Sequence, residues 1–184
     1  TVRTLRLLKI LPNNINIVTG ISGAWRHKAY GDIIAKLGIN QIALDMNHKR
    51  SFSSLQYAVK HLNTTKDVLI LNGDRYFKPQ DLEKLCNGGV NSCGLIEQRN
   101  SLSSDVQTIE TIDNKIMNVG ECVDCNTVPW LSFYGALKLV NLDVNLVKEH
   151  QSSESKGSYI NVLVNQIGIK IEANDVNQIP TKNE

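Results

Sequence analysis

Three polar residues directly after a short apolar run are the best candidates for chemistry in this sequence. Val68–Leu71 has the composition of a buried strand, and Asn72, Gly73 and Asp74 follow it. In an open α/β sheet, ligands bind outside the carboxyl ends of the strands, where Asp74 would lie. A carboxylate there can hold Mg²⁺ against phosphate groups, because Mg²⁺ takes only one or two protein carboxylates. The alternative is a turn or helix cap without a ligand.

A predicted helix immediately before this strand carries the next candidates. Residues 52–62 show apolar side chains at helical spacing, and a serine at the start can cap the helix. Ser53 and Ser54 lie in the predicted first turn, where hydroxyl and backbone N–H groups can contact a base or a ribose. The alternative is that they only cap the helix. The basic segment 48–50 can meet phosphates or form a solvated loop.

The predicted elements alternate between helix and strand over the first half of the chain. This alternation predicts a parallel sheet with helices on its faces and right-handed crossovers. After about residue 91 strands predominate, and Asp113-Asn114 predicts the turn of a hairpin. The expected helices are 3–11, 24–37, 52–62, 79–86, 141–149 and 158–167, and the expected strands are 15–19, 41–44, 67–72, 92–97, 106–112, 115–119, 132–139 and 169–173.

The segments around Asp74 resemble the nucleotidyltransferase superfamily, whose members make nucleoside diphosphate sugars and CDP-alcohols. Members often show an Asn-rich loop, a helix with Ser-Leu and an Ala one turn later, and an apolar strand that ends in Gly-Asp. The corresponding residues here are Asn47, Ser54, Leu55, Ala58 and 69–74. The helix most resembles that of phosphocholine cytidylyltransferases and of relatives that act on sugar phosphates or phosphonates. Flanking segments that are also similar are 5–20, 130–137 and 176–184.

The resemblance implies a single nucleotidyltransferase-like domain over residues 1–184. The implied fold is a Rossmann-like three-layer α/β/α arrangement with a mostly parallel central sheet. The implied reaction transfers a nucleotidyl group, with CMP from CTP favoured, to a sugar phosphate, phosphocholine or phosphonate and releases pyrophosphate. Asp74 would be the catalytic residue and the ligand of Mg²⁺. The residues implied to bind the nucleotide are Asn47, Ser53, Ser54, Asn72 and Gly73.

Three further residues are implied at the acceptor side of the site. Glu97 ends a predicted strand near the place where the family recognises its acceptor. It can bind a cationic or hydroxylated group, or remain a surface carboxylate. Trp130 and Tyr134 belong to the segment that is similar to the strand lining the acceptor pocket. Their rings can hold a quaternary ammonium by cation–π contact, or they can belong to the core.

Two departures from the family pattern bear on catalysis. The family's first unit, a strand with a Gly-rich loop, a basic residue and a Pro-Lys segment, is not found, so the chain reads as an N-terminally truncated or degenerate member. Pro180 stands where the family usually has a second metal-binding Asp, and Asp175 lies five residues earlier, out of register for a direct replacement. Since each preorganised donor to developing charge is worth about 10²–10³ in rate, we expect this chain alone to be a poor catalyst.

Two other functions stay open on these residues. The first is a non-catalytic domain that keeps the fold and binds a partner or a regulatory nucleotide, which the two departures favour. The second is a metal-dependent glycosyltransferase, which would normally show a D-x-D motif at this strand end. Because Asn72 replaces the first acid of that motif, the glycosyltransferase is ranked last.

Composition argues against several other classes of protein. A net charge of +2 over 184 residues gives no electrostatic basis for nucleic-acid binding. No apolar run reaches the ~20 residues of a membrane span, so we expect a cytoplasmic protein without a membrane partner. A homodimer is left open. Cys122 and Cys125 have the C-x-x-C spacing of a zinc or redox pair, with plain thiols as the alternative.

Overall fold

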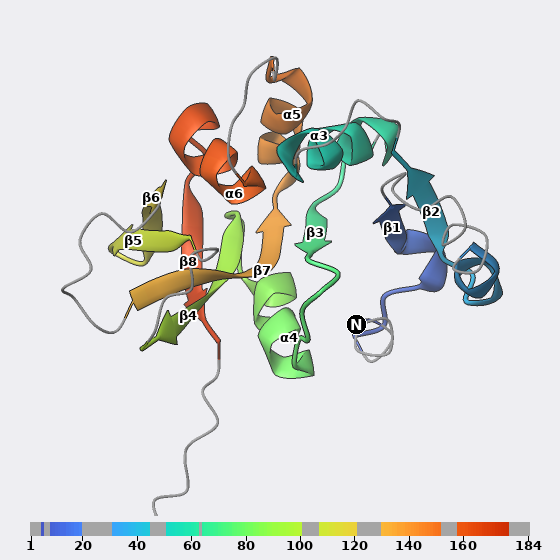
Figure 1. Ribbon diagram of the computed structural model, residues 1–184, viewed down its shortest axis with the longest axis horizontal. Coiled ribbons are helices and arrows are strands. Elements are labelled where there is room, and N and C mark those ends of the chain that lie inside the picture. The colour runs from blue at the N-terminus through green and yellow to red at the C-terminus, as the bar shows by residue number, and fades with distance from the viewer. Residues whose placement is uncertain are drawn as a thin grey trace, which may run out of the picture.

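Helices and strands alternate along the chain (Figure 1). The structure, a computed structural model, describes residues 5, 8–19, 31–44, 51–62, 64–100, 107–120, 130–151 and 158–176. The strands are β1 (Asn16–Thr19), β2 (Asn40–Ala43), β3 (Val68–Leu71), β4 (Cys93–Arg99), β5 (Thr108–Ile112), β6 (Lys115–Gly120), β7 (Trp130–Leu139) and β8 (Ile171–Asp175). The helices are α3 (Ser51–Leu62), α4 (Pro79–Asn87), α5 (Asn141–Glu149) and α6 (Tyr159–Asn161), with the short η1 (Pro12–Asn14) and the π-helical η2 (Val162–Ile167).

The main sheet is mixed, with the strand order β3-β7-β4-β8-β6-β5. Among its described strands, β4 and β8 pair in parallel and the other neighbours pair antiparallel. β1 and β2 form a separate parallel pair. The α/β class predicted from the sequence is confirmed, whereas the prediction of a mostly parallel central sheet is wrong.

Two features account for the antiparallel pairings. Asp113 and Asn114 both have positive φ, 50° and 59°, which is the geometry of a tight hairpin turn and joins β5 to β6. The hairpin predicted at these two residues is therefore confirmed. β7 is ten residues long and enters between β3 and β4 in the opposite direction. The order of elements along the chain does not reveal such an insertion, because long-range register alone defines it.

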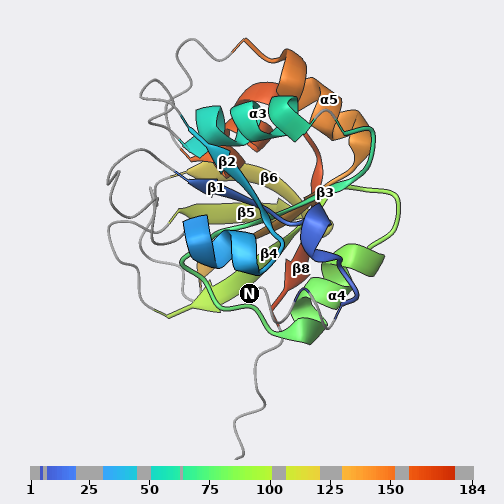
Figure 2. The same cartoon turned by 90° about the vertical axis from the view of Figure 1, so that its right-hand side faces the viewer.

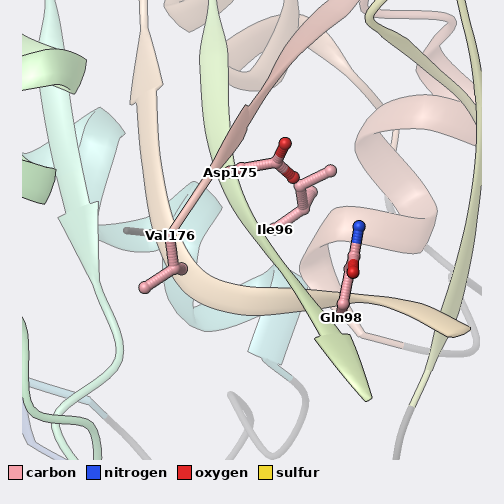
Figure 3. Close-up of a pocket in the computed structure, with 4 residues that line it drawn as sticks. All are labelled: Ile96, Gln98, Asp175 and Val176. Carbon is pink, nitrogen blue, oxygen red and sulfur yellow. The ribbon is translucent and has the colours of Figure 1, made fainter. Parts of the chain in front are cut away.

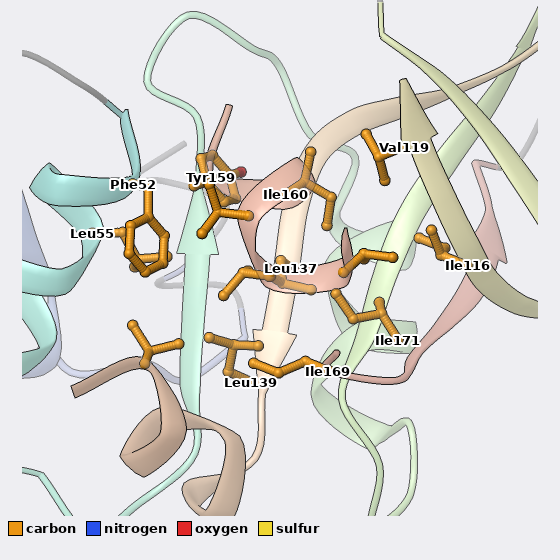
Figure 4. Packing of buried hydrophobic residues seen from close by; sticks show 14 of the residues in the cluster. Phe52, Leu55, Ile116, Val119, Leu137, Leu139, Tyr159, Ile160, Ile169 and Ile171 are labelled. Atoms are coloured by element: carbon orange, nitrogen blue, oxygen red, sulfur yellow. The ribbon is translucent and has the colours of Figure 1, made fainter. Parts of the chain in front are cut away.

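Each face of the main sheet carries its own apolar core, because side chains alternate between the two faces of a strand. On one face, here called the α3 face, Phe52 of α3 and Ile160 of α6 pack with Leu137 and Ile171 of the sheet (Figure 4). On the other, the α4 face, Leu82 and the rest of the apolar stripe of α4 pack under β4 and β7. The two views show α3 and α5 on one side of the sheet and α4 on the other (Figure 2).

The β1–β2 pair lies beyond β3, on the side away from β7 (Figure 1). Its apolar side chains continue the core of the α4 face, since Ile15 and Ile17 belong to the same cluster as Leu69 and Leu71 of β3. β3 therefore contributes to this core, although it is the edge strand of the main sheet and its four residues are half-buried.

Strand ends differ from the predicted ranges by up to two residues, and the helices differ more at 3–11 and 158–167. Residues 8 and 9 form a turn in place of the expected end of the helix 3–11, and Lys9 has a φ of 60°. The expected helix 158–167 begins as α6 and widens into η2, which ends at Gly168 with a φ of 80°. Within the described ranges, no helix combines the length and the apolar character that a membrane crossing requires.

Candidate functional site

The turn after β3 presents its polar residues to solvent at the end of the sheet. The Asn72 N–H donates to the carbonyl oxygen of Gly135 on β7 at 2.8 Å, and the Arg75 N–H donates to the carbonyl oxygen of Asn72 at 3.4 Å. Gly73 and Asp74 occupy the tip of this turn and are exposed. A Cβ at Gly73 would meet no atom within 4 Å, so the space beside the backbone there is open to a ligand.

Tyr159, the first residue of α6, ties this turn to the start of α3. Its hydroxyl donates to Oδ1 of Asn72 at 2.9 Å, and its backbone N–H donates to Oγ of Ser51 at 2.9 Å. The ring itself is buried in the core of the α3 face (Figure 4), where it makes an edge-to-face contact with Phe133, with centroids 5.8 Å apart. One residue therefore holds the end of β3 and the first turn of α3 side by side, together with the half-buried Ser53 and Ser54.

The negative charge of Asp74 affects the pKa of the Tyr159 hydroxyl. Burial raises the pKa of the Tyr159 hydroxyl, and the nearby carboxylate of Asp74 raises it further. The hydroxyl consequently stays protonated and serves as a hydrogen-bond donor at neutral pH. Sequence reasoning did not identify Tyr159, since a tyrosine at the start of a predicted helix gives no signal of a partner so distant in the chain.

Asp74 fits one kind of magnesium site. In the part of the chain that the structure describes, no group of three or more His, Cys, Asp or Glu side chains is arranged to hold a metal ion. A single exposed carboxylate can hold Mg²⁺ when nucleotide phosphates and water supply the remaining ligands. Such a magnesium site would be complete only when the nucleotide is bound, because the phosphates supply part of the ligand set.

Gly135 makes the close approach between β3 and β7 at this turn. It has a φ of 90°, and a Cβ added to it would lie 2.9 Å from Nδ2 of Asn72. A side chain at this position would therefore collide with the residue that Tyr159 holds. Gly135 lies where the pairing of β4 with β7 shifts register, between the partners of Gly94 and Ile96.

Tyr134 holds the segment after Asp74 on the α4 face. Its hydroxyl donates to the carbonyl oxygen of Tyr76 at 3.0 Å, and its ring makes an edge-to-face contact with buried Phe77, with centroids 5.7 Å apart. The guanidinium carbon of Arg75 lies 5.8 Å from the centroid of the Tyr134 ring. Tyr76 is 70% exposed beside this group.

Glu97 and Trp130 lie further along the sheet. Oε1 of Glu97 accepts from Nε of Arg99 at 2.6 Å and from Oγ of Ser132 at 3.2 Å, so its charge is compensated within the protein. Trp130 pairs with Arg99, and its buried indole N–H has no hydrogen-bond partner among the described residues. Four residue steps separate Trp130 from Tyr134 along β7, which is about 13 Å between their Cα atoms.

A small cavity of about 240 Å³ lies beside the carboxyl end of β8, where that strand pairs with β4. Ile96, Gln98, Asp175 and Val176 line it (Figure 3). β7 and β4 separate β3 from β8, so these two strands are about 14 Å apart. The structure therefore does not place Asp175 beside Asp74.

Several predicted residues lie outside the described ranges: Asn47, the basic segment 48–50, Cys122, Cys125 and Pro180. The other two cysteines, Cys86 and Cys93, are free thiols, and burial raises the pKa of both.

Comparison with solved structures identifies the fold. The chain resembles a Bacillus anthracis protein described as a glucose-1-phosphate thymidylyltransferase, with a TM-score of 0.66 and 15% identity over 96% of this chain and 72% of the other. The inositol-1-phosphate CTP transferase from T. maritima gives a TM-score of 0.66 and 15% identity over 95% and 72%. The CTP:phosphocholine cytidylyltransferase from Streptococcus pneumoniae gives 0.60 and 15% over 96% and 74%.

These neighbours show that the chain shares its fold with solved nucleotidyltransferases, which is the fold that the resemblance in the sequence implied. No family model matches the sequence, and the curated proteins contain no match to it.

Proposed function

We propose that this chain is a nucleotidyltransferase domain that binds a nucleoside triphosphate with Mg²⁺ and transfers its nucleotidyl group to a phosphorylated small molecule. The observation that supports this best is the bridge made by Tyr159, which holds the first turn of α3 beside the exposed turn of Asp74. Two structural neighbours are named for reactions of CTP, which favours CTP as the donor.

Each part of the site has a role in this proposal. Asp74 would hold Mg²⁺ through its carboxylate, and the chemistry supplied there would be neutralisation of the triphosphate charge. Ser53 and Ser54 offer hydroxyl and N–H groups to the base or ribose at the positive end of the α3 dipole. Gly73 leaves room for a phosphate to approach the backbone.

The reaction needs little covalent chemistry from the protein. An oxygen of the acceptor phosphate attacks the α-phosphorus, the bond from that phosphorus to the bridging oxygen breaks, and pyrophosphate leaves with the bonding electrons. The contribution of the chain is to align the two substrates and to offset their negative charges, as in other phosphoryl-type transfers.

A thermal-shift panel tests the binding half of the proposal. CTP, UTP, GTP and ATP are each added with and without Mg²⁺. A ligand at about 100 times its Kd stabilises a protein by about 2.7 kcal/mol, which is a shift of roughly 5–10 °C for a chain of this size. We expect such a shift with Mg²⁺ and CTP. No shift with any of the four nucleotides would contradict the proposal.

A transfer assay tests the catalytic half. Pyrophosphate release is measured with the stabilising nucleotide and a set of acceptor phosphates. Release that depends on the acceptor supports the transferase. Binding of nucleotide without any release would assign the chain to the alternative class, a non-catalytic nucleotide-binding domain.

A further inference from the structure

Arg75 places a positive charge directly after Asp74, and the role proposed above does not use it. The Arg75 N–H closes the turn by donating to the carbonyl oxygen of Asn72 at 3.4 Å. The guanidinium lies over the ring of Tyr134, which is fixed by its own hydrogen bond to Tyr76 and its contact with Phe77. Stacking on a fixed ring restricts the guanidinium to one region of the site.

The guanidinium keeps its hydrogen-bonding capacity for a ligand. The ion pairs between described residues join Arg99 to Glu97 and Lys138 to Asp67, and no carboxylate of the described part pairs with Arg75. A guanidinium has five N–H donors in a planar fork, and contact with a ring face occupies none of them. This fork matches the oxygens of a phosphate group.

Arg75 and α3 approach the turn of Asp74 from opposite faces of the sheet. Tyr134 and Phe77, which lie next to Arg75, belong to the core of the α4 face. Tyr159, which anchors the start of α3, belongs to the core of the α3 face. Asp74 and Arg75 are consecutive residues with Cα atoms about 3.8 Å apart, so both side chains start from the same turn. One phosphate group can therefore bind on each side of this turn.

We infer that Arg75 binds the phosphate of the acceptor, and that the rest of the acceptor is a neutral, hydroxylated group rather than a quaternary ammonium. This inference rests on the proposed function. The cation–π position over Tyr134 is already filled by Arg75, and a second cation there would be repelled. Glu97, the other candidate for a cation, is already paired with Arg99. Its Oε1 also accepts a hydrogen bond from the hydroxyl of Ser132.

Calorimetric titration of the full chain with three small phosphates tests this inference. The probes are inorganic phosphate, glycerol 1-phosphate and phosphocholine, and the variants are Arg75→Met, Arg75→Lys and the control Lys115→Met on exposed β6. Arg75→Met keeps an unbranched side chain near the ring and removes the charge. Arg75→Lys keeps the positive charge and removes the planar set of guanidinium N–H donors. It therefore still measures the role of the guanidinium if Arg75→Met is destabilised.

The expected result is glycerol phosphate affinity reduced about 10- to 100-fold in Arg75→Met, reduced less in Arg75→Lys, and unchanged in the control. Wild-type chain should bind phosphocholine about tenfold more weakly than glycerol phosphate. Unchanged phosphate binding in Arg75→Met, no phosphate binding by the wild type, or preference for phosphocholine would each overturn the inference.

Nucleotide binding, measured on the same samples, separates this inference from the proposed function. Mg²⁺-CTP binding should be unchanged in Arg75→Met, because the inference assigns Arg75 to the acceptor. Arg75-dependent phosphate binding without any nucleotide binding would overturn the proposed function and leave the phosphate site standing. Loss of nucleotide binding alone in Arg75→Met would assign Arg75 to the triphosphate and overturn the inference.

Discussion

The hydroxyl of Tyr159 donates a 2.9 Å hydrogen bond to Oδ1 of Asn72, although 87 positions separate the two residues in the chain. The backbone N–H of the same tyrosine donates to Oγ of Ser51 at the start of α3. Through Tyr159, the start of α6 therefore contacts both the end of β3 and the start of α3, and Asp74 lies in the turn that this contact holds. Removing the hydroxyl should loosen the turn without opening the core that holds the ring.

Tyr159→Phe should lower the free energy of unfolding by about 1 kcal/mol, the net value of one hydrogen bond. For a chain of this size that is a fall in Tm of about 2–4 °C, measured by differential scanning calorimetry at pH 7. The same variant should bind Mg²⁺-nucleotide more weakly, since Asn72 loses the contact that fixes the turn. A variant with wild-type Tm and wild-type nucleotide affinity would show that the bridge has no role.

Alkaline pH should destabilise the wild type through the same group. The pKa of Tyr159 is raised in the folded chain, so the unfolded chain loses this proton first as the pH rises. The stabilisation is complete below the ordinary tyrosine pKa of about 10 and is lost as the pH climbs above it, at up to about 1.4 kcal/mol per pH unit.

Thermal melts at pH 9 and pH 11 measure this effect. The wild type should lose roughly 3–6 °C more than Tyr159→Phe between the two values, because the variant has no proton to lose at this position. Equal losses in the two proteins would mean that Tyr159 ionises as an exposed tyrosine does.

Gly135→Ala should destabilise the chain by well over 1 kcal/mol. The backbone there has a φ of 90°, and the new Cβ would approach Nδ2 of Asn72 to 2.9 Å. Gly120→Ala on β6 is the matched control, because its Cβ would meet nothing within 4 Å. Urea melts of the two variants should show a reduced midpoint for the first and a midpoint near wild type for the second. Equal midpoints would show that β7 can move away from the turn.

Gly73→Ala separates folding from ligand binding at the tip of the turn. Its Cβ would point into open space, so the Tm should stay within about 1–2 °C of the wild type. The affinity for Mg²⁺-nucleotide should fall, because the methyl group occupies the space into which a phosphate would approach. Retained affinity would place the phosphates elsewhere on the chain.

Local patterns in the sequence predicted most elements of the fold. The apolar run at Val68–Leu71, the apolar stripe of α3 and the Asp113-Asn114 turn all appear where their periodicity or turn chemistry indicates. These signals are local, since a strand, a helix face and a hairpin turn each depend on neighbouring residues. The α/β class follows from their order along the chain.

The order in which the strands pair within the sheet could not be predicted from local sequence patterns. β7 lies antiparallel between β3 and β4, and nothing within its ten residues states which strands flank it. The roles of Tyr159 and Gly135 likewise exist only because the fold brings each to Asn72. Glu97 and Arg99 form an ion pair two residues apart on one strand. The opposite charges are visible in the sequence, but the partial burial of the pair depends on the fold.

Asp74→Asn tests the central claim most directly. Asp74 is exposed, so the variant should keep the wild-type Tm, and the amide cannot supply the charge that Mg²⁺ needs. Isothermal titration with CTP in the presence and absence of Mg²⁺ is the measurement. We predict that the wild type binds CTP more tightly with Mg²⁺ and that the variant loses this dependence. Equal Mg²⁺-dependent binding in the two proteins would contradict the assignment of Asp74 as the metal ligand.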